Sequence, residues 1–169
     1  MCGILGAATV GDAPVLEGVR RGLAGLRHRG PEATRTQVFS TDHSAVVLGH
    51  TRLRIIDTTE SADQPLSNED GSVQVVFNGE LYNFVELRSE LEQAGHRFAT
   101  SSDTEVLVHL YEQVDGNPNA LLERLRGMFA FALFDTTEGR LLLARDRLGI
   151  KPLYHAAIPS GVWPPNSDL

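Results

Sequence analysis

The chain has 169 residues, of which 41% are hydrophobic and 22% are charged, the composition of an ordinary globular protein of one domain. This composition excludes a disordered tail, a collagen and a disulfide scaffold, and the formal net charge of −7 argues against nucleic acid as a partner, because phosphate contacts need a basic face. The longest apolar run, residues 128–134, is much shorter than the ~20 residues that cross a bilayer, so no membrane partner is expected.

Three strands and one helix are expected in the first part of the chain, the strands over 2–9, 37–39 and 45–50 and the helix over 14–26. The strand segments are short and apolar and are bounded by turn residues, and the helix carries one apolar stripe. Asp12 is expected to cap this helix and Pro14 to occupy its first turn. The polar residues 41–44 are expected to form a turn between two strands, and residues 56–71 to form a loop.

Three more strands and three more helices are expected, the strands over 73–77, 128–135 and 140–145 and the helices over 83–93, 103–111 and 120–125. Asn78-Gly79 is expected to end the first of these strands, Gly95 to close the first helix, and Ser101 or Ser102 to cap the second. Strands and helices come in groups rather than in alternation, which favours an α+β fold with antiparallel sheets and helices stacked outside them.

Cys2 is the only cysteine and directly follows Met1. A single cysteine allows no intramolecular disulfide and, since no signal-peptide pattern is visible, a reducing cytoplasmic compartment is expected. Removal of Met1 would give Cys2 a free α-amine with a pKa of about 7.7–8.0, so that one residue could supply both a nucleophile and its general base. The alternative, which the dipeptide alone favours, is a structural cysteine in a buried strand.

Seven further segments follow Cys2 in a fixed order and are informative when they are read together. With the N-terminus they are Met1-Cys2-Gly3-Ile4, Arg27-His28-Arg29-Gly30-Pro31, residues 48–57, Gln64-Pro65, residues 77–83, Ser102-Asp103-Thr104-Glu105, residues 126–135 and residues 145–154. This series resembles the glutaminase domain of glutamine-hydrolysing asparagine synthetases, a class II glutamine amidotransferase domain, from Cys2 to about Tyr154. The resemblance implies the N-terminal-nucleophile hydrolase fold, with two antiparallel β-sheets sandwiched between α-helical layers. It also implies hydrolysis of L-glutamine to glutamate and ammonia.

The resemblance assigns the catalytic roles to three residues. Cys2 resembles the nucleophile that attacks the side-chain amide of glutamine and forms a thioester, with its own amine moving the proton. Asn78 and Gly79 resemble the oxyanion hole, which the asparagine builds with its side-chain NH₂ and the glycine with its backbone N–H. An ordinary hairpin turn is the alternative for an isolated Asn-Gly dipeptide.

A glutamine zwitterion needs one cation and one anion in its pocket. By resemblance, Arg52 binds the α-carboxylate and Asp103 binds the α-ammonium group. Taken singly, these residues would be explained as a surface charge and a helix cap. The other residues implied to line the pocket, mainly through backbone groups, are Leu53, Arg54, Ile55, Ile56 and Glu80.

Two further motifs are assigned to the structure around the pocket. Arg29-Gly30-Pro31 resembles the loop that closes over the site, although Glu32 stands where the family usually has aspartate. Arg145-Asp146-Arg147 is interpreted as an ion-paired turn. The six histidines show no metal-ligand spacing with acidic residues, so no metal site is expected.

The expected organisation is a glutaminase domain over residues 2–157, truncated at its C-terminus, followed by an irregular tail over 158–169. No cofactor is expected in this chain. ATP and Mg²⁺ belong to the synthetase domain of the family, whose Ser-Gly-Gly-x-Asp-Ser type of signature is missing here, as is a Walker-type loop. The expected partners are L-glutamine and a synthetase domain or subunit that makes an amide from aspartate.

Two alternatives to this function stay open at the level of the sequence. One is a non-catalytic or partner-dependent module of a split synthetase. The other is a different class II branch, such as the glucosamine-phosphate synthases. The run His50-Thr51-Arg52-Leu53-Arg54-Ile55 favours the asparagine synthetase branch.

Overall fold

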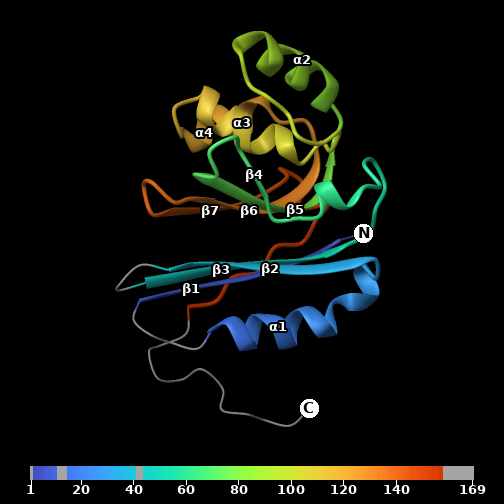
Figure 1. The fold of residues 1–169 in the computed structure, drawn as a ribbon, viewed down its shortest axis with the longest axis vertical. Coiled ribbons are helices and arrows are strands. Elements are labelled where there is room, and N and C mark those ends of the chain that lie inside the picture. The colour runs from blue at the N-terminus through green and yellow to red at the C-terminus, as the bar shows by residue number, and fades with distance from the viewer. Residues whose placement is uncertain (1, 11–14, 41–43, 158–169) are drawn as a thin grey trace.

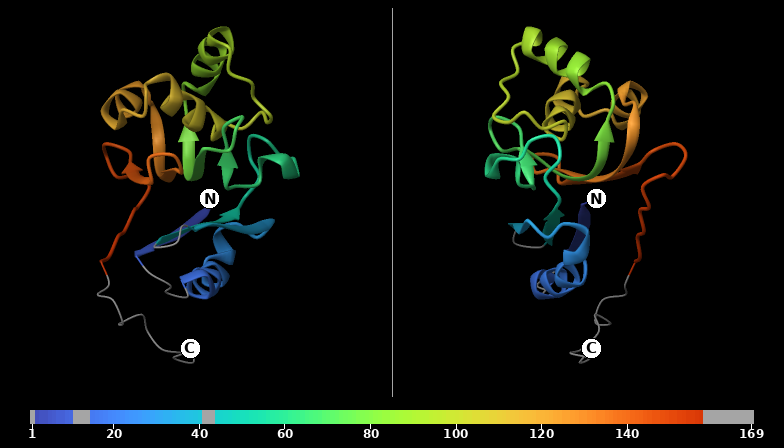
Figure 2. Two further views of the ribbon diagram at one scale, coloured as in Figure 1. Left: turned by 60° about the vertical axis from the view of Figure 1, so that its left-hand side comes forward. Right: turned by 90° about the vertical axis from the view of Figure 1, so that its right-hand side faces the viewer.

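Two antiparallel sheets stack face to face and carry helices on both outer sides in the computed structural model, which describes residues 2–10, 15–40 and 44–157 (Figure 1). Helix α1 (Val15–Gly25) covers the first sheet. Helices α2 (Phe84–Ala94), α3 (Glu105–Gln113) and α4 (Pro118–Arg124) cover the second, as the side views in Figure 2 also show. The arrangement confirms the expected α+β fold with two antiparallel sheets between helical layers.

The first sheet has the strand order β1–β3–β2, formed by β1 (Gly3–Val10), β3 (Ser44–Arg52) and β2 (Ala33–Ser40). Strand β2 is longer than the predicted 37–39, because most of its side chains are exposed and hide the strand pattern, while it pairs with β3 along its whole length. The predicted helix over 14–26 is confirmed as α1, and a 3₁₀ turn, η1 (Arg27–Arg29), follows it. Asp12, Pro14 and residues 41–43 lie outside the described residues.

The second sheet has the order β4–β5–β6–β7, formed by β4 (Leu66–Ser67), β5 (Val73–Leu81), β6 (Gly127–Asp135) and β7 (Arg140–Arg145). The strands expected over 128–135 and 140–145 are confirmed as β6 and β7, which pair antiparallel as a hairpin. The segment 56–71 is more than the predicted loop, since it contains β4 and the 3₁₀ turn η2 (Glu60–Ala62). A two-residue strand is too short to show the alternation on which strand prediction depends.

Strand β5 does not end at Asn78-Gly79 as the sequence predicts, but continues to Leu81. Asn-Gly is common in turns because glycine adopts a positive φ, yet Gly79 is not among the described glycines with positive φ. A Cβ atom on Gly79 would lie 2.2 Å from the carbonyl oxygen of Met128 on β6. The glycine is therefore required by the close approach of β5 and β6 rather than by a turn.

The ends of the helices follow the prediction in part. Gly95 closes α2 in the left-handed conformation, with φ of 107°, as expected. Neither Ser101 nor Ser102 is the N-cap of α3, which is Thr104, although the Ser102 hydroxyl accepts a hydrogen bond from the Thr104 N–H at 3.2 Å. These residues instead form a tight turn that precedes the helix.

Three apolar clusters hold the four layers together, and β3 contributes to two of them. Val47 packs against Val15, Val19 and Leu23 of α1. The neighbouring side chains on β3 point the other way, as strand geometry requires, into the cluster between the two sheets. That cluster consists of Val46, Leu48, Val76, Ala132 and Phe134. The largest cluster lies between the second sheet and α2, α3 and α4.

The turn after β7 is organised by hydrogen bonds to one carboxylate rather than by the predicted ion pairs. Asp146 accepts backbone N–H bonds from Phe129, Leu148, Ile150 and Lys151, at 2.9–3.2 Å. These bonds lower the pKa of Asp146 although its burial opposes the shift. Arg147 donates to the carbonyl oxygens of helix α4 and its end, not to a carboxylate. Within the described residues, no helix has the length and apolar character needed to cross a membrane.

Candidate active site

A cavity of about 160 Å³ lies where the beginning of β1 and the end of β3 meet the middle of β5. It is lined by Cys2, Arg52, Leu53, Ile55, Ile56, Asp57, Gln64, Phe77, Asn78, Gly79, Glu80, Ser102, Asp103, Thr104, Met128 and Lys151. The structure therefore brings together every residue that the sequence assigned to the site except Arg54. The Arg54 side chain instead pairs with Asp63 at 3.1 Å.

Strand alternation explains why the polar side chains of both sheets converge on this cavity. On β3, Arg52 lies on the same face as Leu48, which packs between the sheets. On β5, Asn78 likewise shares the face of Val76, which belongs to the same cluster between the sheets. Cys2, one residue before β1, shares the face of Ile4, which also packs against that cluster. Cys2, Arg52 and Asn78 thus all occupy positions that face the space between the two sheets.

The Cys2 thiol contacts the backbone of Leu53, whose N–H lies 3.4 Å from Sγ and whose carbonyl oxygen lies 3.7 Å from it. The Cys2 carbonyl oxygen accepts a bond from Arg29 Nε at 3.1 Å, so the loop of Arg29 fixes the start of β1. Burial raises the pKa of the Cys2 thiol, and the Leu53 hydrogen bond and the charge of Arg52 offset this only in part. The thiol is therefore protonated at neutral pH and needs a base to become a nucleophile.

Arg52 is held in place by three acceptors that leave one edge of its guanidinium open. Nη1 donates to the Thr59 carbonyl oxygen at 2.7 Å and to Asp63 Oδ1 at 2.6 Å, and Nη2 donates to the Asp57 carbonyl oxygen. Arginine has five N–H donors, and within the described residues Nε has no acceptor. The Nε edge of a buried, oriented guanidinium suits a carboxylate.

Asp103 contributes a buried carboxyl group to the cavity. Its Oδ2 accepts the Leu81 N–H at 2.9 Å, and the residue is only 5% exposed. Burial raises the pKa of the Asp103 carboxyl, and the nearby charge of Glu80 adds to the shift, whereas the Leu81 N–H opposes it. A carboxylate that is costly to leave unpaired favours a cationic ligand group.

Asn78 and Gly79 present unused donors to the cavity. The Asn78 side chain is buried, and the described part of the chain offers no hydrogen-bond partner to its carboxamide. Backbone N–H groups alternate between the two edges of a strand, so the N–H of Gly79 shares an edge with those of Phe77 and Leu81. These two donate to Gln64 Oε1 at 2.6 Å and to Asp103 Oδ2. Because β4 pairs with β5 only as far as Val75, the edge at Gly79 is left for a ligand.

Gly79→Ala is expected to destabilise the fold by about 1–3 kcal/mol, the usual cost of overpacking, because the added Cβ would lie 2.2 Å from the Met128 carbonyl oxygen and 2.7 Å from Phe129 Cα. Urea denaturation measures the change in the free energy of unfolding. Gly25→Ala is the matched control, since a Cβ there meets nothing within 4 Å, and it should be neutral or slightly stabilising. Equal stability of both variants would show that β5 and β6 do not approach this closely.

Several cavity residues were not identified from the sequence. Gln64 links the Phe77 N–H to Thr104, to whose hydroxyl it donates at 3.1 Å. Asp57 accepts the Ser101 N–H at 2.8 Å and so connects the β3 end to the turn of Asp103. Met128 and Lys151 complete the wall. The only available signal was that they lie inside the ordered segments of the sequence, and no periodicity distinguishes such single side chains from their neighbours.

Asp63 is a positioning residue that the sequence did not reveal. It is buried and forms ion pairs with Arg52 at 2.6 Å, with Arg54 at 3.1 Å and with Arg35 at 3.2 Å. Burial would raise the pKa of its carboxyl, but the hydrogen bonds and charges of Arg54 and Arg52 outweigh it and lower the pKa. Arg54 thus neutralises the anion that orients Arg52, which explains why it lies behind the cavity wall.

The sequence matches the family described as "Glutamine amidotransferase domain" over residues 1–166. The chain belongs to this family. Among the curated relatives of the amidotransferase domain is "Asparagine synthetase [glutamine-hydrolyzing] 2" of Oryza sativa subsp. japonica, 42% identical over an alignment of 170 residues that covers 96% of this chain and 26% of the relative. Another is "Asparagine synthetase [glutamine-hydrolyzing] 1" of Bacillus subtilis, 45% identical over 136 residues, which are 80% of this chain and 20% of the relative.

A solved structure similar to the domain is the glutamine phosphoribosylpyrophosphate amidotransferase from Bacillus subtilis. The TM-score is 0.67 with 27% sequence identity, and the match covers 86% of this chain and 37% of that chain. The resemblance to asparagine synthetases and the N-terminal-nucleophile amidotransferase fold are thereby confirmed. The domain spans only about a quarter of the length of the first curated relatives that it matches.

Proposed function

We propose that the domain hydrolyses L-glutamine to glutamate and ammonia, and that the ammonia serves a synthetase domain or subunit of the asparagine synthetase type. The observation that carries this proposal is that one cavity is lined by four kinds of group. These are the thiol of Cys2, the open guanidinium edge of Arg52, the buried carboxylate of Asp103 and the unused N–H donors of Asn78 and Gly79. Arg52 and Asp103 match the two charges of a glutamine zwitterion. The side-chain amide of the ligand is then directed toward Cys2.

The proposed reaction uses the donors of the cavity in sequence. Once Met1 is removed, the Cys2 amine takes the thiol proton while Sγ bonds to the amide carbon, and the negative charge on oxygen is held by Asn78 and the Gly79 N–H. The C–N bond then breaks, and ammonia leaves with the proton from the amine. Water attacks the resulting thioester, which releases glutamate and restores the thiol.

We also propose that this hydrolysis uses no cofactor of its own, and that ATP and Mg²⁺ act only in the synthetase part. The partner-dependent alternative remains distinct, because it predicts an intact cavity that turns over glutamine only in a complex. Arg52, whose guanidinium is already fixed by Asp63 and two carbonyl oxygens, favours activity of the isolated chain, since its geometry needs no partner.

Trapping and product analysis together test the proposal. The purified chain is incubated with L-glutamine, and ammonia and glutamate are expected in equal amounts. An L-glutamine analogue with an electrophilic ketone in place of the amide should add once, on Cys2, as seen by peptide mass spectrometry, and should stop both products. The D-enantiomer is the control, because it reverses the placement of the two charges. A chain that neither adds the analogue nor releases products would overturn the proposal.

The pH dependence of kcat/KM is expected to rise through an ionisation near the α-amine value of about 7.7–8.0, because the amine must be neutral to accept the thiol proton. The raised pKa of the thiol keeps the thiolate from forming first. A second decrease in kcat/KM is expected at lower pH. The carboxyl of Asp103, whose pKa is raised by burial, becomes neutral as the pH falls and then no longer binds the ammonium group of glutamine.

The rate of Cys2 alkylation by iodoacetamide against pH is the control for this assignment, since it reports the thiol ionisation alone. The thiol should titrate above the ionisation seen in kcat/KM. Coincidence of the two profiles would assign the kinetic ionisation to the thiol, and the role of the amine as base would be wrong.

A further inference from the structure

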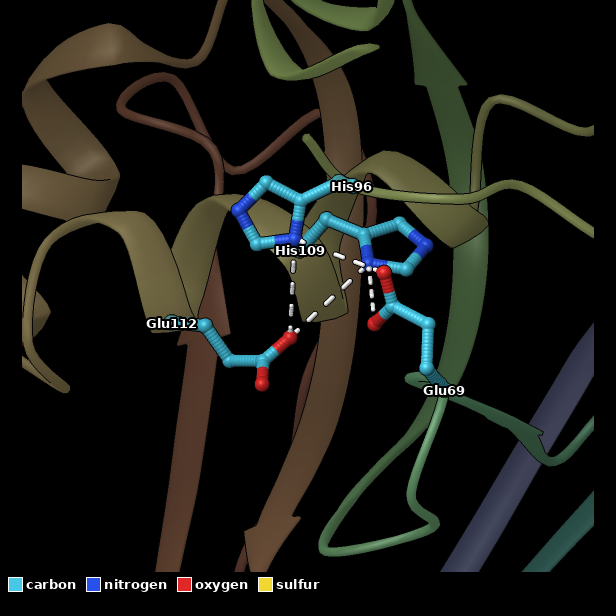
Figure 3. Close-up of side chains that lie close together, drawn as sticks. All are labelled: Glu69, His96, His109 and Glu112. Carbon is cyan, nitrogen blue, oxygen red and sulfur yellow. Dashed lines mark ion pairs between the residues drawn. The ribbon is translucent and has the colours of Figure 1, made fainter. Parts of the chain in front are cut away.

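Two histidines and two glutamates from three segments of the chain meet on the outer side of the second sheet, away from the cavity (Figure 3). Glu69 lies in the turn after β4, His96 in the loop after α2, and His109 and Glu112 on α3. None of the four lines the glutamine cavity. One ligand atom from each residue lies within 4.8 Å of the others.

The ligand atoms are spaced as the corners of a small metal site. His109 Nδ1 lies 3.2 Å from Glu69 Oε2 and 3.8 Å from Glu112 Oε2. His96 Nδ1 lies 3.7 Å from Glu69 Oε1 and 3.9 Å from Glu112 Oε2. Zinc bonds of about 2.0–2.2 Å in a tetrahedron place neighbouring ligand atoms roughly 3.3–3.5 Å apart. The four histidine–glutamate distances are within about half an ångström of this spacing, and the widest separation in the set, up to 4.8 Å, would have to close further around an ion.

Both histidines turn the same ring nitrogen toward the cluster and the other toward an oxygen acceptor. His109 Nε2 lies 3.5 Å from Glu105 Oε1, and His96 Nε2 lies 3.4 Å from Gln113 Oε1. An Nε2–H aimed at an acceptor leaves the lone pair on Nδ1, which is the arrangement that second-shell groups impose on metal-bound histidine. Glu105 is itself fixed by the N–H groups of Ala99 and Thr100.

The cluster contains buried atoms that lack hydrogen bonds. The two atoms that would face the ion, His109 Nδ1 and Glu112 Oε2, are buried without a hydrogen-bond partner, and the His109 side chain is 0% exposed. The other oxygen atoms are already held, since Asn68 Nδ2 donates to Glu112 Oε1 at 2.9 Å and the Arg97 N–H to Glu69 Oε1 at 2.7 Å. A divalent cation placed between these facing atoms would satisfy both of them.

We propose that Glu69, His96, His109 and Glu112 bind one divalent transition-metal ion, with Zn²⁺ as the best match to two imidazoles and two carboxylates. Four protein ligands in a closed set indicate a structural rather than a catalytic ion. The ion would join the β4–β5 turn and the α2–α3 loop to helix α3, and through Glu105 it would support the turn that carries Asp103.

Metal binding is tested on a tag-free Cys2→Ala chain, so that the N-terminal thiol does not bind the ion. After removal of metal by a chelator, titration with Zn²⁺ should show one equivalent bound, and thermal unfolding should shift upward by several degrees, because the ion binds the folded state. Co²⁺ should give the visible absorption of a tetrahedral site. Mg²⁺, which prefers oxygen ligands in an octahedron, should cause neither change.

Variants of the less buried ligands decide whether this cluster is the site. His96→Ala and Glu112→Gln should each weaken Zn²⁺ binding by about tenfold or more and remove most of the thermal shift. Glu112→Gln keeps an acceptor for Asn68, and a cooperative thermal transition without metal confirms its fold. The exposed His155 and Glu123 provide the controls His155→Ala and Glu123→Gln, which should bind as the parent does.

Two results would overturn the proposal. One is the absence of stoichiometric Zn²⁺ binding, which would make the cluster a set of protonated histidine–carboxylate contacts. The other is binding that survives both His96→Ala and Glu112→Gln. Because the measurements need no glutamine and use a chain without the nucleophile, their outcome is independent of the proposed hydrolysis.

Discussion

Replacing Cys2 with alanine should lower kcat for glutamine hydrolysis by about 10⁴-fold or more, the scale on which loss of a covalent nucleophile reduces an enzyme. No other described side chain in the cavity is a thiol, and Cys2 is the only cysteine in the chain. The fold should remain, because the Cys2 sulfur makes only the long contacts of 3.4 and 3.7 Å with Leu53. Ammonia release at saturating glutamine gives kcat, and thermal unfolding gives the stability.

Cys2→Ser is the informative companion to this variant. Serine keeps a hydroxyl beside the α-amine, but the pKa of this hydroxyl is far higher than that of a thiol. The Cys2→Ser variant should therefore turn over glutamine much more slowly than the parent, although it should bind glutamine equally well. Both variants should still be protected by glutamine against thermal unfolding, since Arg52 and Asp103 are unchanged. Parent-like turnover by Cys2→Ala would assign the nucleophile to another group or the activity to a contaminant.

Asn78→Ala should reduce kcat by about 10²–10³-fold, equivalent to about 2.7–4 kcal/mol of transition-state stabilisation. The Asn78 carboxamide has no partner within the described residues, so its donors are available for the charge that develops on the amide oxygen. KM should change little, because the charged ends of glutamine are held elsewhere. The separation of kcat from KM distinguishes an oxyanion donor from a residue that only binds substrate.

Asn119→Ala, on the exposed surface of α4, is the control for the effect of the substitution type and should leave both constants unchanged. If Asn78→Ala instead raises KM and leaves kcat intact, the carboxamide contributes to ground-state binding. The oxyanion would then depend on the Gly79 N–H alone.

Local patterns in the sequence were sufficient for the α+β fold with antiparallel sheets and outer helices, whereas the cavity residues were assigned by the family resemblance. Alternation along apolar strands places Arg52, at the end of β3, and Asn78, within β5, on the faces between the sheets. The same local reasoning was wrong at Asn78-Gly79, where the dipeptide predicts a turn. The need for glycine there comes from Met128 on a strand about fifty positions away, a contact that no local pattern reports.

The residues that orient the site were beyond prediction for a related reason. Asp63 gathers Arg35, Arg52 and Arg54 from different segments, and none of these pairs has a helical or strand spacing. The cluster of Glu69, His96, His109 and Glu112 was equally hard to predict, because its residues come from three separate segments and only His109 and Glu112 are neighbours on a helix. Histidine spacing in the sequence therefore gave no sign of it, and the expectation of no metal site rested on spacing alone.

The small apolar cluster between the two sheets has a further consequence. Val46 and Leu48 from one sheet meet Val76, Ala132 and Phe134 from the other. His50, which burial keeps neutral by lowering its pKa to about 3, adds a hydrogen bond to the backbone of Phe77 across the same boundary. Cys2 and Arg52 belong to one side of this boundary, and Asn78 and Gly79 to the other. A molecule of glutamine in the cavity would thus contact residues of both sheets and link them. If one sheet shifted relative to the other, the Cys2 sulfur would move away from Asn78 and Gly79 even though every strand stayed intact.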